Sequence, residues 1–148
     1  NGLDQSLVCR YSCTQGKCLA AFDIAKANQG DFSNPLYNVP QPELNGRSDT
    51  FQGYVAFGSY IYILSGTSNA VNGGNLDSEV TSVDVNTGKI HQGPVFTQAG
   101  KSLEFREPEG MGVYTTAAGE PRLFLGFASG KAGDRRSNLF YKNLLIEA

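Results

Sequence analysis

The chain has 148 residues, and its 12 basic and 14 acidic side chains give a net charge of -2. This balance excludes the basic footprint of a nucleic-acid-binding protein, and no apolar run approaches the length of a membrane-spanning helix. Eighteen glycines, no tryptophan, and frequent turn signals between aromatic and β-branched runs predict one all-β domain over residues 1–148.

The start of the chain indicates processing and export. It opens at Asn1 while its one methionine, Met111, lies deep inside, so we expect a cleaved precursor or a fragment. Cys9, Cys13 and Cys18 are close together, and a zinc site would need a fourth ligand that the distant His91 does not supply. A disulfide in a secreted or cell-surface protein is favoured, with one thiol left over, Cys13 in the predicted turn being the candidate.

The first half of the chain contains one hairpin and a long connection. Residues 6–11 and 18–24 are predicted strands on either side of a turn at 14–16, and residues 1–25 are interpreted as the outer hairpin of one propeller blade. Residues 26–50 are rich in proline, glycine, asparagine and serine, a composition that predicts a surface connection.

From residue 51 the strand rhythm becomes regular. Four short strands are predicted at 54–57, 60–64, 79–85 and 89–92, which makes residues 51–96 a complete blade. In residues 97–148 three more strands are predicted, at 111–115, 122–127 and 137–144. About nine strands make two to two and a half blades, whereas a closed ring needs at least about four blades. Either another chain completes the ring, or the strands form a nine-stranded β-sandwich instead.

Four motifs occur in an order that resembles a known propeller family. They are Phe51-Gln52-Gly53-Tyr54, Ser82 to Gly88, Phe105-Arg106-Glu107-Pro108-Glu109-Gly110-Met111 and Gly126 to Gly130, followed by Arg135-Arg136 and Leu139 to Lys142. Over residues 18–142 the chain resembles the C-terminal half of the β-propellers shared by teichoic acid biosynthesis protein C, phage receptor-binding proteins and helveticin-like bacteriocins.

The resemblance implies a propeller that associates with cell-surface glycopolymers, and it implies no established catalytic mechanism. The N-terminal half of such proteins is absent from this sequence. We therefore expect a second polypeptide, the N-terminal half of the same precursor, to complete the ring. A homodimer of two half rings is the other solution, because symmetric pairs are common.

The charged segment before the strand at 111–115 has two interpretations. Glu107 and Glu109, with Glu104 nearby, are candidate general acid/base carboxylates for glycoside cleavage, with Arg106 as a substrate clamp. Alternatively, Arg106 pairs with a carboxylate and ties neighbouring blades together. The structural interpretation is favoured, because charge pairs stabilise folds more often than they catalyse.

A basic loop supplies the other candidate ligand contacts. Lys131, Arg135 and Arg136 suit phosphate or uronate groups on a polymer, so the predicted ligand-binding set is Arg106, Glu107, Glu109, Lys131, Arg135 and Arg136. The spacing of Asn72, Asn75, Asp77 and Glu79 matches no dedicated calcium loop, and we predict neither metal nor cofactor. No nucleophile motif accompanies the single histidine.

The sequence therefore predicts an exported segment of a β-propeller that binds a glycan or cell-surface glycopolymer. The alternatives are an enzyme that degrades polysaccharide or cell wall through Glu107 or Glu109, and a component of a bacteriocin or toxin. An enzyme is the less favoured interpretation, because no recognisable catalytic constellation occurs in the sequence.

Overall fold

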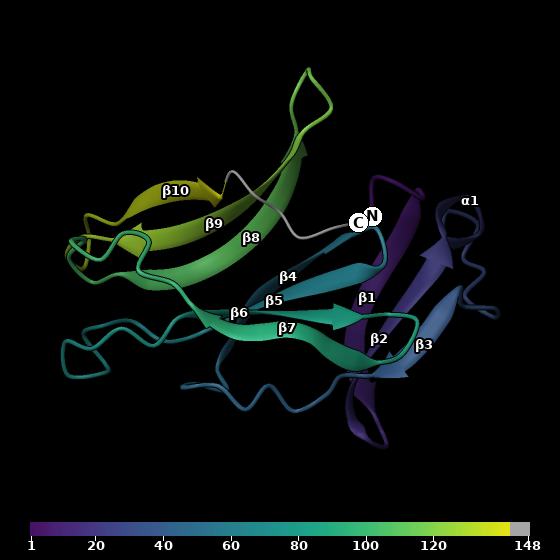
Figure 1. Ribbon diagram of the computed structural model, residues 1–148, viewed down its shortest axis with the longest axis horizontal. Helices are drawn as coiled ribbons and strands as arrows, with labels where there is room; N and C mark the ends of the chain where they lie inside the picture. Colours follow the sequence, from purple (N-terminus) through teal and green to yellow (C-terminus); the bar gives the residue numbers. More distant parts are fainter. Residues whose placement is uncertain (143–148) are drawn as a thin grey trace.

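Three antiparallel sheets make up the protein, and the computed structural model describes residues 1–142. Sheet 1 contains β1 (Ser6–Cys13), β2 (Gly16–Asp23) and β3 (Tyr37–Pro40). Sheet 2 contains β4 (Phe51–Phe57), β5 (Tyr60–Ser65), β6 (Glu79–Asp84) and β7 (Lys89–Phe96). Sheet 3 contains β8 (Glu107–Thr115), β9 (Pro121–Ser129) and β10 (Arg136–Lys142). Figure 1 shows sheet 2 in the middle, with sheet 3 at the upper left and sheet 1 at the right.

The hairpins form where turn chemistry predicts them. The turn between β6 and β7 is held by Asp84, whose carboxylate accepts hydrogen bonds from the Asn86 amide at 2.8 Å and the Thr87 hydroxyl at 3.2 Å. Gly88 then adopts a φ of 68°, a conformation that favours glycine. The predicted hairpin over 79–92 is therefore confirmed, with strands of slightly different length.

The long connection holds more structure than its composition predicts. It includes the strand β3, which pairs with β2 and widens the first hairpin to three strands. It also begins within α1 (Ile24–Ala27), a single turn in which the Asp23 carboxylate accepts a hydrogen bond from the Lys26 amide. Alternating Tyr37 and Val39 supply the apolar face of β3, a signal that the surrounding prolines mask.

Sheets 1 and 2 pack face to face around one apolar core. Its buried centre contains Leu19 from β2, Ile61 and Ile63 from β5, and Val83 from β6. Against this core pack Val8, Tyr37 and Val39 of sheet 1 and Phe51, Tyr54 and Ala56 of sheet 2.

Sheets 2 and 3 share a second core on the opposite face of sheet 2. Its buried members are Phe57, Tyr62 and Leu64 from sheet 2 and Leu123, Leu125 and Phe127 from sheet 3. Because β5 alternates between the two cores, every one of its residues from Ile61 to Ser65 is buried. Sheet 2 is thus the covered middle layer of the three.

The first strand of each sheet lies nearest a common axis. Residues of β1, β4 and β8 line one cavity of about 460 Å³ together with residues 1–3. The Tyr54 hydroxyl on β4 donates a hydrogen bond to the Val8 carbonyl on β1 at 2.9 Å, so the first hairpin places β1 on the inner side of its sheet. Within residues 1–142 the sheets fan about this axis without closing into a ring. The fold of this described part is a partial β-propeller of three sheets rather than the nine-stranded sandwich.

The first two strands of sheet 2 and the first two strands of sheet 3 pair with the same register shift. In β4 the pairing with β5 shifts between Phe51 and Gly53, and in β8 the pairing with β9 shifts between Pro108 and Gly110. β4 and β8 therefore each contain a β-bulge immediately before a glycine, with Gln52 and Glu109 as the extra residues. Aligning the two bulges makes Gly53 equivalent to Gly110, and every later position of β8 is equivalent to one of β4.

The two inner strands approach each other most closely at these glycines. A Cβ atom placed on Gly53 would lie 2.9 Å from the Gly110 Cα, closer than real Cβ atoms come to backbone. Gly53 has no positive φ, so its requirement for glycine comes from the neighbouring strand rather than from its own conformation.

We expect Gly53→Ala to destabilise the protein by about 1–3 kcal/mol, because the added methyl group forces the inner strands of sheets 2 and 3 apart. Urea unfolding followed by far-UV circular dichroism measures this. The matched control is Gly112→Ala on β8, where a Cβ meets no atom within 4 Å. An equal loss of stability in both variants would contradict the close-approach explanation.

Candidate functional site

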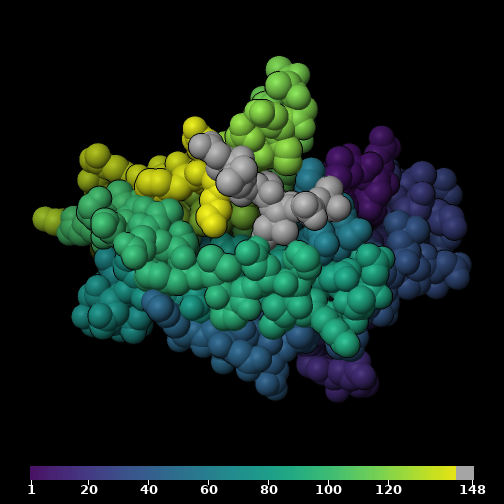
Figure 2. Space-filling view, in the orientation of Figure 1, coloured from purple at the N-terminus to yellow at the C-terminus, as the bar shows by residue number. Residues whose placement is uncertain are grey.

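Three loops gather at one end of sheets 2 and 3. They span residues 66–78, 97–106 and 130–135, and Figures 1 and 2 show them together at the left. The Asn69 amide donates a hydrogen bond to the Arg106 carbonyl at 3.2 Å, and the Gly130 amide donates one to the Glu104 carbonyl at 2.8 Å. The structure thus brings the charged segment and the basic loop, which are separated in sequence, to the same end of the fold.

Arg106 lies at the centre of this end and is fully buried, with 0% of its surface exposed. Its guanidinium donates hydrogen bonds to the Ala99 carbonyl at 2.6 Å, the Ser78 hydroxyl at 2.8 Å and the Thr97 carbonyl at 3.2 Å. It also lies 4.1 Å from the centre of the Phe127 ring on β9. Burial lowers the pKa of Arg106, and the nearby negative charge of Asp77 opposes that shift.

These contacts tie sheet 2 to sheet 3, as the structural interpretation of Arg106 predicts, but the partners differ. Within residues 1–142 Arg106 forms no ion pair, so the expected carboxylate partner is replaced by two backbone carbonyls and a hydroxyl. A side chain with no exposed surface does not reach a ligand in this conformation. The geometry therefore favours a structural role over the predicted role as clamp.

Glu107 and Glu109 are separated by the bulge of β8. Glu107 pairs with Ala128 in the ladder, whereas Glu109 is the unpaired bulge residue. The side of the strand that each carboxylate occupies is therefore set by the bulge, and simple alternation does not apply. Glu109 borders the outer face of sheet 3, the face turned away from sheet 2, and Glu107 does not.

The basic loop is exposed and partly ordered by an aromatic ring. The Arg135 guanidinium lies 3.1 Å from the centre of the Phe105 ring and donates a hydrogen bond to the Gly130 carbonyl. Arg136 forms an exposed ion pair with Asp134 at 3.4 Å. Lys131 is exposed beside them and has no ion pair within the described residues. Lys131 and Arg135 are therefore accessible to an anionic group in solution.

The outer face of sheet 3 forms a hollow of about 720 Å³. Three of the predicted residues, Glu109, Arg135 and Arg136, lie at one edge of this hollow. Its floor and walls are apolar, and they include Gly110, Gly112, Tyr114, Phe124, Gly126 and Leu139. Sequence reasoning did not single out this apolar group, although alternate positions along β8, β9 and β10 share one face and mark it.

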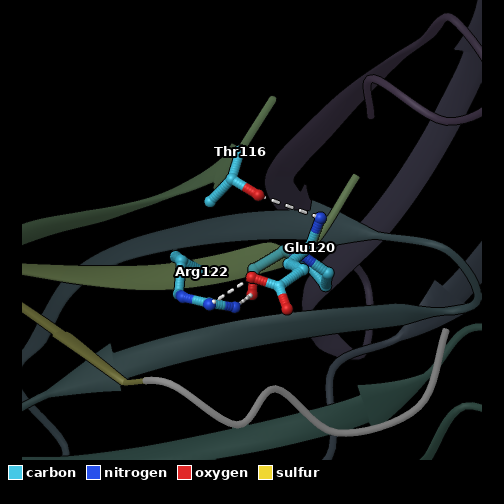
Figure 3. Close-up of polar contacts among 4 residues, drawn as sticks. Thr116, Glu120 and Arg122 are labelled. Atoms are coloured by element: carbon cyan, nitrogen blue, oxygen red, sulfur yellow. Dashed lines mark hydrogen bonds and ion pairs between the residues drawn. The ribbon is translucent and has the colours of Figure 1, made fainter. Parts of the chain in front are cut away.

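A second polar group lies at the opposite end of β8 and β9. In Figure 3 the Glu120 carboxylate accepts a hydrogen bond from the Arg122 guanidinium at 2.6 Å, and the Glu120 amide donates one to the Thr116 hydroxyl at 3.1 Å. Arg122 is paired with Tyr114 across the ladder, on the outer face. The apolar hollow is thus bordered by charged side chains at both ends.

The cysteines pair differently from the expectation. Cys13 and Cys18 form a disulfide across the first hairpin, and Cys9 is the free thiol. The suggestion that Cys13 is left over is therefore wrong, because β1 and β2 bring Cys13 and Cys18 within a Cα distance of 5.9 Å.

The polar loop considered for calcium is satisfied internally. Asp77 accepts hydrogen bonds from the Thr67 amide and hydroxyl, and Glu79 accepts one from the Arg47 amide. Within residues 1–142 no group of three or more His, Cys, Asp or Glu side chains is placed to hold a metal ion. Asp77 and Glu79 therefore order the loop that carries Ser78 to Arg106.

We expect Arg106→Met to destabilise the protein by at least about 3 kcal/mol, because it leaves the buried Thr97 carbonyl, the partly buried Ala99 carbonyl and the buried Ser78 hydroxyl without their donor. The midpoint of urea unfolding measures this loss. The control is Arg136→Met, whose exposed ion pair predicts a change within about 0.5 kcal/mol. A small change in the Arg106 variant would show that the guanidinium does not tie the sheets together.

Comparisons with known proteins agree with this architecture. A family model described as the phage five-bladed β-propeller receptor-binding platform domain matches residues 7–141, and no curated protein sequence matches. In residues 1–142 the structure contains no helix long and apolar enough to cross a membrane. The match covers β2 to β9 and all but one residue each of β1 and β10, so all three sheets fall within the family model. This chain belongs to the family of phage receptor-binding platform domains built on a five-bladed β-propeller.

Proposed function

We propose that this chain is part of a receptor-binding propeller that recognises a glycan or glycopolymer at a cell surface, without cleaving it. The observation that carries the proposal is the family match across residues 7–141, whose description names a receptor-binding platform. The Cys13–Cys18 disulfide supports a location outside the reducing cytoplasm, on a particle or in a secreted protein.

The loop end of sheets 2 and 3 is the surface that best fits such a ligand. Loops mounted on a rigid sheet scaffold commonly carry binding residues. Here the buried Arg106 orders the loops from beneath, while Lys131 and Arg135 remain exposed, with Arg135 over the Phe105 ring. An arginine with a fixed guanidinium plane suits bidentate contact with phosphate or carboxylate groups of a polymer.

The geometry gives less support to an enzyme. Glycoside cleavage needs two carboxylates held at a defined separation across the bond. Glu107 stands in the ladder and Glu109 stands in the bulge, and of the two only Glu109 borders the hollow. We therefore propose that these carboxylates contribute to ligand contact or to local structure rather than to proton transfer.

We expect Lys131→Ala and Arg135→Ala each to weaken binding by about tenfold, because each removes a charge-assisted contact to the ligand. The measurement is binding to an array of neutral and anionic cell-surface glycans, repeated at higher salt. Lys89→Ala is the matched control, since Lys89 is an exposed lysine at the opposite end of sheet 2. Equal binding by all variants would place the site elsewhere, and steady release of reducing ends from a polysaccharide would overturn the binding role in favour of an enzyme.

We also propose that a second polypeptide, the N-terminal part of the same precursor, supplies the blades that complete the ring. Residues 1–142 form three sheets, whereas the matching family is five-bladed. Both end sheets turn apolar side chains outward, among them Leu7 and Tyr11 on β1 and Leu139 and Tyr141 on β10. Cys9 lies on that outward side of sheet 1, so it replaces Cys13 as the thiol that would join a partner covalently.

Native material is expected to contain this chain of 15.9 kDa together with an additional polypeptide. Intact mass spectrometry under native and denaturing conditions, with and without reduction, measures the composition and shows whether Cys9 forms an intermolecular bond. A stable monomer of this mass, with no co-purifying chain, would contradict ring completion. A particle made of two copies would favour the homodimer.

A further inference from the structure

We propose that the outer face of sheet 3 is the docking face for the next β-sheet of the ring, and that the docked sheet inserts a large apolar side chain over Gly112 and Gly126. This inference rests on the proposed completion of the ring and identifies where, and by what kind of surface, the partner attaches.

The repeat between sheets 2 and 3 shows what this face corresponds to. The face of sheet 2 that packs against sheet 3 carries Val55, Phe57, Tyr62, Leu64, Val80 and Ser82. The equivalent outer positions of sheet 3, in the same order, are Gly112, Tyr114, Phe124, Gly126, Leu139 and Tyr141. The outer face of sheet 3 therefore repeats, position by position, a face that already packs against a neighbouring sheet.

The two faces differ in how far they are covered. Tyr62 and Leu64 on sheet 2 are fully buried beneath sheet 3. On the outer face of sheet 3, Tyr114 is 59% exposed, Leu139 is 69% exposed and Tyr141 is 59% exposed. A contiguous apolar face of this kind, bordered by charged side chains, is typical of a surface that binds another protein element.

The chemistry of the docked sheet follows from the two glycines. At the positions equivalent to Val55 and Leu64 of sheet 2, sheet 3 has Gly112 and Gly126. Because glycine has no side chain, these positions leave the hollow of about 720 Å³. A Cβ on Gly112 would meet no atom within 4 Å. Protein interiors are close-packed, so a docked sheet must fill this hollow with a side chain. That side chain must be larger than the ones that sheet 3 packs against Val55 and Leu64 of sheet 2.

The inner strand of the docked sheet has a defined position as well. Gly53 on β4 lies against Gly110 on β8, and Gly110 is the equivalent residue one sheet further round the axis. A Cβ on Gly110 would meet nothing within 4 Å in this chain. The next inner strand therefore passes beside Gly110, as β8 passes beside Gly53.

The test uses the whole natural gene, expressed with a tag on this chain, so that the assembly forms as it does in nature. Hydroxyl-radical footprinting then compares the oxidation of Tyr114, Leu139 and Tyr141 in the assembly and in this chain alone. We expect protection of at least about fivefold in the assembly. Val71, an exposed residue in the 66–78 loop that does not line the hollow, is the internal control and should oxidise equally in both.

Gly112→Leu tests the hollow directly. Gly112 has no positive φ and open space for a side chain, so this chain should keep its own unfolding midpoint while losing the partner and the protection. Ala118→Leu, in the exposed turn between β8 and β9, is the matched control and should assemble normally. Two Gly112→Leu results overturn the proposal: normal assembly, or loss of the chain's own stability.

The footprint also separates this proposal from those on which it rests. If the assembly forms with Tyr114, Leu139 and Tyr141 still accessible, the ring is completed elsewhere and this docking face is wrong. If no partner joins the unchanged chain, ring completion fails together with it. Glycan binding is measured in a separate experiment, with the Lys131→Ala and Arg135→Ala variants, so its failure is told apart from a failure of docking.

Discussion

Sheets can be arranged around an axis only if their innermost strands come close together, and in this protein Gly53 makes that possible. It lies against Gly110 on the adjacent inner strand, where a Cβ on Gly53 would touch backbone. Both follow a β-bulge, which adds twist to the strand at the point of closest approach.

Arg106 provides a polar contact between sheets 2 and 3 in addition to this close approach of the inner strands. Charged side chains are rarely buried unless all of their hydrogen-bonding groups are used. Its guanidinium spans the space between the loops of sheet 2 and the Phe127 ring of sheet 3, and it holds carbonyls that would otherwise be unpaired. The planar fork of donors explains why an arginine, rather than a lysine, suits this place. The order of the loop end, and therefore of any ligand surface on it, depends on this one buried cation.

The same repeat explains both the apolar hollow and the charged groups around it. Sheet 3 has the same strand pairing as sheet 2. On its outer face, however, Gly112 and Gly126 occupy the positions that Val55 and Leu64 occupy on the face of sheet 2 that packs against sheet 3. Arg135 and Arg136 at one edge and Arg122 near the other keep the face soluble at its borders. A hollow of this kind serves to receive another sheet, whereas the exposed basic loop beside it serves a ligand. Two roles can therefore exist side by side on one small domain.

The sequence by itself determined the β class and the hairpins at 54–64 and 79–92, because alternation and turn chemistry are local properties. The propeller family was indicated by the resemblance of four motifs, and the match of the family model over residues 7–141 agrees with it. It also marked the charged segment and the basic loop. Only the tertiary structure decided that Arg106 is buried, that Cys13 pairs with Cys18, and that Tyr37 to Pro40 form a strand. Each of these depends on contacts that only the fold creates: the Ser78 hydroxyl of another loop and the Phe127 ring for Arg106, the opposite strand of the hairpin for Cys13, and the edge of β2 for residues 37–40. Local sequence patterns carry no information about such partners, and for that reason the bulge that separates Glu107 from Glu109 was also visible only in the folded protein.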